Sequence, residues 1–90
     1  MPVVHFTQNL VRHVECHRLE TTGDTLVDVL GQVFARFPRA KTYVLDEQGA
    51  VRKHMVIFVD GKQLVDRTKL TDPVHQSSQI YIMQALSGGV

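Results

Sequence analysis

Three residues near the N-terminus, His13, Cys16 and His17, are of the types that bind metal ions or act as nucleophiles. If this segment is an extended strand, alternate side chains point to opposite faces of the sheet. His13 and His17 then share one face, and Cys16 points to the other. No second cluster in the sequence supplies further ligands at the Cys and His spacing of a structural zinc site. We therefore predict that the protein has no metal site.

Motifs for nucleotide binding and nucleophilic catalysis are missing from the sequence. Gly61-Lys62 is followed by Gln63, where a phosphate-binding loop has Ser or Thr, and the upstream glycine of that loop is also missing. No Gly-x-Ser-x-Gly is present to expose a serine nucleophile. We expect a protein that is not an enzyme and binds no cofactor, so that any nucleotide chemistry comes from a partner. Three further histidines are expected at the surface without a catalytic role: His5, His54 and His75.

Composition and charge exclude several other classes of protein. The chain has 90 residues, 43% of them hydrophobic, which allows one domain with a modest core. Its single cysteine cannot form an internal disulfide, and the N-terminus lacks the features of a signal peptide, so we expect a cytoplasmic protein. The net charge is +1 without a run of Lys or Arg, and neither nucleic acid nor a membrane surface is expected as a partner. The longest apolar run, residues 55–59, is too short to span a bilayer.

One amphipathic helix is predicted between Asp24 and Pro38. Apolar residues recur there at the spacing of a helix that buries one stripe: they are Leu26, Val29, Leu30, Val33, Phe34 and Phe37. Gln32 is expected on the exposed side. Thr25 and Asp28 fit a capping box, in which the threonine hydroxyl accepts a hydrogen bond from an unpaired backbone N–H. Pro38 disfavours helical geometry in the residue before it and should end the helix.

Short segments rich in β-branched and aromatic residues predict the strands. Residues 2–8 and 13–20 are expected to pair as an antiparallel hairpin. Strand 55–59 is followed by Asp-Gly at 60–61, a dipeptide typical of a tight hairpin turn because both turn positions need positive φ. A short return strand follows, and residues 80–86 supply a last strand. Residues 39–54 are predicted to be mostly loop.

This order of elements fits an α+β domain with one main helix packed on one face of a mixed sheet. If the last strand lies beside the first, the two form a parallel central pair. The arrangement is that of the ubiquitin-like β-grasp fold, although the same order also suits other small α+β sheets. We expect the β-grasp domain to cover residues 1–86 and to be followed by a flexible Gly-Gly tail at 87–90.

The predicted order, the sequence FVDG at 58–61 and the terminal Gly88-Gly89 resemble the MoaD/ThiS family of ubiquitin-like sulfur-carrier proteins. In that family an E1-like enzyme uses ATP to adenylate the C-terminal glycine carboxylate, and sulfur from a donor replaces AMP to give a thiocarboxylate. The resemblance implies that Gly89 is the carrier residue and that Leu86, Ser87 and Gly88 enter the active site of the partner. It also implies a sulfur-accepting synthase as a later partner.

Val90 departs from the family pattern, because it places a peptide bond where a competent carrier has a free carboxylate. The family includes carriers from which a JAMM-type metalloprotease removes extra C-terminal residues, so the resemblance implies a precursor that loses Val90. Two alternatives are a vestigial ubiquitin-like domain and adenylation of the valine itself, which its stiff β-branched side chain disfavours. Terminal glycines are also common in ordinary frayed tails.

The predicted sheet carries more apolar residues than one buried face requires. A sheet covered by one helix needs a single apolar face, so the second set, which includes Phe58, Tyr81 and Met83, should face outward. The resemblance implies that this open face docks the activating enzyme, whereas the structural alternative is that residues 39–54 cover it. The functional alternative is a ubiquitin-like module that binds a protein partner and is never acylated.

Overall fold

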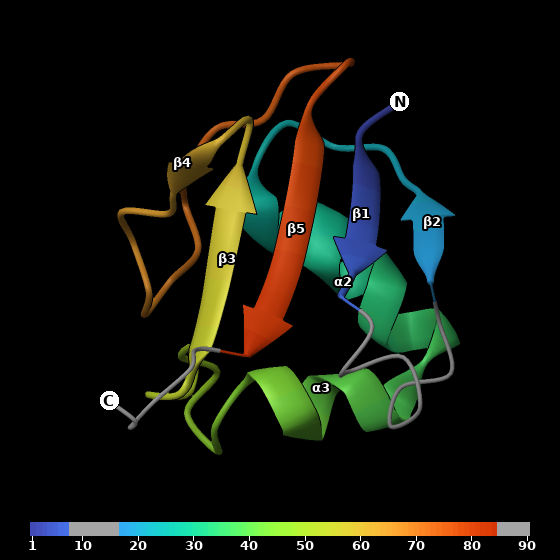
Figure 1. Ribbon diagram of the computed structural model, residues 1–90. Coiled ribbons are helices and arrows are strands. Elements are labelled where there is room, and N and C mark those ends of the chain that lie inside the picture. Colours follow the sequence, from blue (N-terminus) through green and yellow to red (C-terminus); the bar gives the residue numbers. More distant parts are fainter. Residues whose placement is uncertain (8–16, 85–90) are drawn as a thin grey trace.

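The computed structural model describes residues 1–7 and 17–84. Within these ranges the elements are β1 (Val3–Phe6), β2 (Arg18–Glu20), α2 (Leu26–Arg36), α3 (Pro38–Val44), β3 (Met55–Val59), β4 (Lys62–Gln63) and β5 (Gln79–Gln84). The described strands form one sheet in the order β2-β1-β5-β3-β4, and both helices lie on the same side of it (Figure 1). β1 and β5 run parallel, and the other neighbouring pairs run antiparallel. The chain therefore has the ubiquitin-like β-grasp fold, as predicted.

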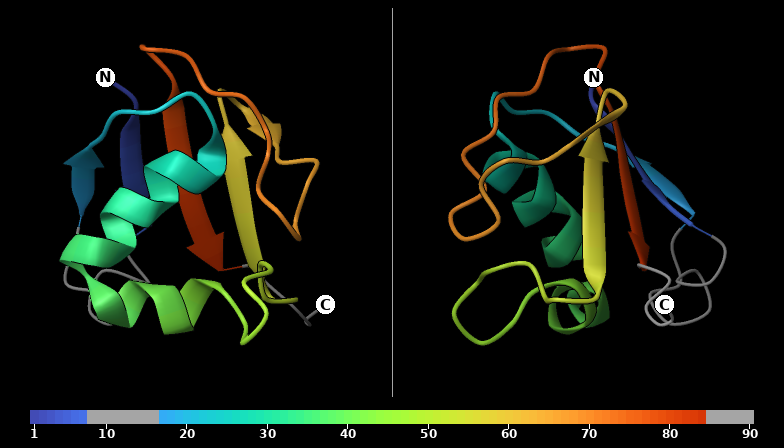
Figure 2. Two further views of the ribbon diagram at one scale, coloured as in Figure 1. Left: turned by 180° about the vertical axis from the view of Figure 1, so that it is seen from behind. Right: turned by 60° about the vertical axis from the view of Figure 1, so that its left-hand side comes forward.

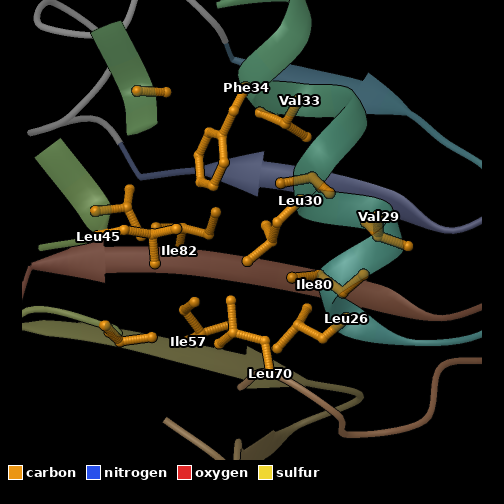
Figure 3. Packing of buried hydrophobic residues seen from close by; sticks show 14 of the residues in the cluster. Leu26, Val29, Leu30, Val33, Phe34, Leu45, Ile57, Leu70, Ile80 and Ile82 are labelled. Carbon is orange, nitrogen blue, oxygen red and sulfur yellow. The ribbon is translucent and has the colours of Figure 1, made fainter. Parts of the chain in front are cut away.

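The inner face of the sheet is buried under α2. The predicted apolar stripe of this helix is confirmed from Leu26 to Phe34, and its side chains pack against the inward residues of β3 and β5 (Figure 3). Those inward residues are Met55, Ile57, Ile80 and Ile82. Phe37, the last member of the predicted stripe, is only partly buried and lies between the two helices.

Two details of α2, the cap at Thr25 and the exposure of Gln32, differ from the prediction. Thr25 Oγ1 donates to Asp28 Oδ2 at 3.0 Å instead of accepting a backbone N–H, so the predicted capping bond is wrong. The N–H of Leu26 donates to the carbonyl oxygen of Asp72 at 2.8 Å, and the segment before β5 thus satisfies a helix N–H that has no partner within the helix. Gln32 is half-buried rather than exposed, and its Oε1 accepts the N–H of Thr22 at 2.9 Å.

The second helix, α3, corrects the prediction that residues 39–54 are mostly loop. Pro38 does end α2, but it also lies in the first turn of α3, where its missing N–H costs no helical hydrogen bond. Ala40 and Val44 are buried against the same core as α2, and so is Leu45 beyond the helix. With seven residues and two buried positions, α3 is too short to give a clear amphipathic period in the sequence.

The predicted tight turn between β3 and β4 is confirmed. Asp60 and Gly61 have φ values of 52° and 83°, the positive region that a two-residue hairpin turn requires. The Asp60 carboxylate also accepts hydrogen bonds from Ser78 Oγ at 2.7 Å and from the N–H of Gln79 at 2.9 Å. These bonds, led by that of Ser78, lower the pKa of Asp60 and tie the turn to the start of β5.

Gly31 lies on an exposed side of α2 and has no need within the fold to be glycine. A Cβ added there meets no atom within 4 Å. Glycine inside a helix is less favourable than alanine by about 0.8–1 kcal/mol. We expect Gly31→Ala to raise the free energy of unfolding by about 0.5–1 kcal/mol, measured by urea denaturation. A loss of stability would contradict the geometry of α2 around this residue.

The Asp66 carboxylate organises the turn that follows β4. It accepts the N–H of Lys69 at 2.9 Å and the hydroxyl of Thr71 at 2.6 Å, and these bonds hold its pKa well below the ordinary value. A carboxylate with a lowered folded-state pKa stabilises the fold above about pH 4, and this contribution is lost progressively at lower pH. We therefore expect Asp66→Asn to destabilise the protein more at about pH 7 than at about pH 2, measured by urea denaturation at both. Equal losses at the two pH values would contradict the role of the charged form.

Candidate functional site

Neither helix lies over the sheet face opposite α2 (Figure 1). The strand pairing places apolar and aromatic residues on this face. The strand pairing places Tyr81 between His5 on β1 and Phe58 on β3. In the next row Met83 lies opposite Val56. Tyr81 is 41% exposed, and the other four residues are half-buried. We call these five residues the outer-face cluster. The prediction that Phe58, Tyr81 and Met83 share the outward face is thus confirmed.

The Tyr81 ring is held in place by His5. The two rings stack with centroids 4.5 Å apart and planes inclined by 12°. His5 Nε2 is also 2.7 Å from Oε1 of Gln79, one residue pair along the same face. An aromatic side chain that is already ordered loses little conformational entropy on binding, and tyrosine is enriched at protein interfaces. The pair therefore has the properties of a preformed anchor for a protein partner.

Residues 39–54 do not cover the outer-face cluster, so that alternative is wrong. The buried side chains of this segment, Ala40, Val44, Leu45 and Val51, belong to the core on the inner side of the sheet. The view along the edge of the sheet places α3 on the same side as α2 (Figure 2, right). Within residues 1–7 and 17–84, no helix or loop covers the extra apolar residues of β3 and β5.

The second part of the site is the end of β5, where the chain leaves the sheet toward its C-terminus. Gln84 pairs with Met55, and beside it lies a shallow hollow of about 260 Å³ that is lined in part by Arg52 and His54. The predicted tail residues Leu86, Ser87, Gly88 and Gly89 lie outside the described residues, as does Val90. Gly89 follows Gln84 by five residues, and five extended residues span at most about 17 Å.

The backbone beside this hollow is fixed by a second arginine. Nη2 of Arg67 donates to the carbonyl oxygens of Arg52 and Met55 at 2.7 and 2.8 Å. The N–H of Arg52 donates to the carbonyl oxygen of Val44 at 2.9 Å. The backbone that carries Arg52 and precedes Met55 is therefore fixed beside the end of β5.

The sequence alone did not identify the roles of His5, Arg52 and His54. The predicted parallel pairing of the first and last strands indicates that His5 lies near the last strand. The register that places His5 beside Tyr81, however, depends on the folded sheet. Arg52 and His54 reach the end of β5 only because the segment after α3 returns to the sheet. His75, expected at the surface, is exposed.

The prediction that the protein has no metal site can be checked only for the described residues. Among residues 1–7 and 17–84, no three His, Cys, Asp or Glu side chains are close enough to hold a metal ion. His13 and Cys16 lie outside these ranges, so the prediction of no metal site stays a prediction. In the described part of the chain, no helix is both long and apolar enough to cross a membrane.

The architecture and the open face define a small ubiquitin-like β-grasp domain, and solved structures agree. A chain of the Amycolatopsis orientalis BexX/CysO complex matches with a TM-score of 0.83 and 19% identity, over 99% of this chain and 100% of that one. Small archaeal modifier protein 1 (SAMP1) from Methanosarcina acetivorans matches with a TM-score of 0.80 and 20% identity, over 98% and 95%. Mycobacterium tuberculosis CysO matches with a TM-score of 0.81 and 18% identity, over 96% and 100%. The sequence matches no protein-family model and no curated protein.

These structural neighbours are ubiquitin-like sulfur-carrier and modifier proteins of the MoaD/ThiS β-grasp type. The predicted resemblance is thereby confirmed in the structure as well as in the order of elements. At 18–20% identity the likeness establishes the shared fold. Function has to be argued from the site itself.

Proposed function

We propose that this protein is a sulfur carrier whose Gly89 carboxylate is adenylated by an E1-like enzyme and converted to a thiocarboxylate. The observation that supports this most is the position of β5. This strand carries Tyr81 and Met83 on the open face and leads directly into the Gly-Gly tail. An enzyme that binds the outer-face cluster would therefore hold the start of the tail at a fixed distance from its own active site.

The proposed chemistry has two steps, both catalysed by partners. A Gly89 carboxylate oxygen attacks the α-phosphorus of ATP, which releases pyrophosphate and forms an acyl adenylate. Hydrosulfide released by the donor then attacks the carbonyl carbon, AMP leaves with one of the former carboxylate oxygens, and the thiocarboxylate has sulfur in place of that oxygen. The contribution of this chain is a narrow segment without side chains at Gly88 and Gly89, which can enter a confined active site. A sulfur-accepting synthase would take the sulfur from the thiocarboxylate.

Val90 makes processing part of this proposal. The Gly89 carbonyl is bonded to the Val90 nitrogen in the sequence as written and has no carboxylate to adenylate. A JAMM-type metalloprotease is the partner proposed to remove it. We place this chemistry in the cytoplasm, where a single unpaired cysteine is stable in its reduced form.

The adenylation step can be tested without the sulfur donor. The E1-like enzyme should exchange labelled pyrophosphate into ATP in the presence of the chain that ends at Gly89, and not in the presence of the chain that keeps Val90. If both chains bind the enzyme and neither supports exchange, the protein is a ubiquitin-like binding module that is not acylated.

A charge placed in the outer-face cluster is expected to disrupt docking. Met83→Glu should weaken binding to the E1-like enzyme by about tenfold or more, because a carboxylate would be desolvated in an apolar contact. Titration calorimetry measures the affinity, and circular dichroism checks the fold. The matched control is Gln48→Glu, in the turn after α3, which should bind normally. Unchanged affinity of a folded Met83→Glu variant would remove β5 from the interface.

A further inference from the structure

On the helix side of the molecule lies a groove of about 480 Å³ that the proposed carrier function does not use. It is lined by residues of α2, by Lys41, Leu45 and Gly49, and by residues 68–70. The view from behind shows α2, α3 and the segment between β4 and β5 on this side of the sheet (Figure 2, left). Four core side chains reach its floor: Leu30, Phe34, Leu45 and Leu70. Its volume lies within the range of about 300–1,000 Å³ that is usual for ligand sites.

The α2 wall of this groove is apolar and low. Val27, Gly31 and Ala35 follow one another at four-residue spacing and are all exposed, Val27 to 46%. Gly31 is the unusual member, because a helix interior disfavours glycine and the fold leaves open space where its side chain would be. The missing side chain keeps the groove open and allows another chain to approach the helix closely.

The charged groups of the groove are both cationic and come from different walls. Lys41 is on α3, and Lys69 is in the turn that follows β4. Neither ammonium group forms an ion pair within residues 1–7 and 17–84. The Thr68 hydroxyl already donates a hydrogen bond to Asp66 Oδ1 at 3.0 Å. The side-chain groups left to recognise a polar ligand are thus two ammonium groups on either side of an apolar floor.

We propose that this groove binds a short acidic amphipathic segment of a partner protein. Apolar side chains of that segment would lie over Leu30 and Phe34, and its carboxylates would pair with Lys41 and Lys69. A segment with acidic residues before and after its apolar residues carries an anion at each end of an apolar centre, whereas a fatty acid carries a single anion at one end. The groove and the outer-face cluster lie on opposite sides of the sheet, so both can be occupied together. The proposal does not depend on whether Gly89 carries sulfur.

The test is an NMR titration of the full chain with three defined probes. They are an acetylated and amidated Glu-Leu-Glu-Leu-Glu peptide, the matching Lys-Leu-Lys-Leu-Lys peptide, and octanoate. The Glu-Leu peptide should shift the amide resonances of Gly31, Ala35 and Leu70 saturably. The Lys-Leu peptide should bind at least about tenfold more weakly.

Charge reversal makes the test specific to the two lysines. The Lys41→Glu/Lys69→Glu variant should bind the Glu-Leu peptide at least about tenfold more weakly and should bind the Lys-Leu peptide better than the native chain does. The Lys53→Glu/Lys62→Glu variant, with the same change in net charge outside the groove, should retain the native preference. Gly31→Leu should block binding by filling the groove while the fold persists. The proposal is overturned if the Glu-Leu peptide does not bind, if it shifts the outer sheet face instead, or if only octanoate occupies the groove.

Discussion

Replacing Leu30 by alanine is expected to lower the free energy of unfolding by about 2–5 kcal/mol. Leu30 is 1% exposed and points from α2 toward β5, where Ile80 and Ile82 lie (Figure 3). The truncation removes buried methyl groups and leaves a cavity, and both effects destabilise the fold. Because a small domain is stable by only about 5–15 kcal/mol, the variant should unfold at clearly lower urea concentration, followed by circular dichroism.

The control for this prediction lies on the same helix. Val27 is 46% exposed, and Val27→Ala should change the free energy of unfolding by less than about 0.5 kcal/mol, since alanine also has the higher helix propensity. Similar losses for the two variants would mean that the buried face of α2 has been assigned incorrectly.

At α2 and at the β3–β4 turn the structure agrees with the prediction from the sequence, because the signals for both elements are local. Eleven residues of α2 repeat the helical period three times, and Asp60-Gly61 requires a backbone conformation that few other dipeptides accept. Such signals are contained in neighbouring residues. The parallel pairing of β1 with β5 could be predicted for a different reason. One helix can cover only one face of one sheet, so the strands had to form a single sheet.

The differences arise where distant segments meet. The first N–H groups of α2 are satisfied by carbonyl oxygens of residues 70 and 72, which no local capping pattern could indicate. Gln32 is held by Thr22, ten residues earlier. The stacking of His5 on Tyr81 and the approach of Arg52 to the end of β5 depend in the same way on the register and on the return of the chain after α3. These contacts position the candidate site, while the tail residues that would do the chemistry are identified by sequence alone.

The second large effect is expected from the peptide bond between Gly89 and Val90. Truncation after Gly89 should convert an inert chain into a substrate of the E1-like enzyme, because adenylation at Gly89 requires a free carboxylate on that residue. In the full-length chain the only free C-terminal carboxylate belongs to Val90, whose stiff β-branched side chain disfavours entry into a narrow active site. The effect should be all or none. The full-length chain should become a substrate only after a protease has removed Val90.

A bulky residue at the carrier position provides the matched control. Gly89→Leu in the truncated chain retains a free carboxylate and leaves the described fold unaltered, since position 89 lies five residues beyond β5. Conversion should nevertheless be abolished, because the side chain would not fit an active site shaped for two glycines. Full conversion of this variant would show that the narrow tail is not required.

Intact-protein mass spectrometry tests the central claim most directly. The chain that ends at Gly89 is incubated with the E1-like enzyme, ATP and a sulfur donor, beside the full-length chain. We expect the truncated chain alone to gain the mass difference between sulfur and oxygen, and fragmentation to locate that gain at Gly89. A truncated chain that binds the enzyme and keeps its original mass would contradict the proposed carrier function.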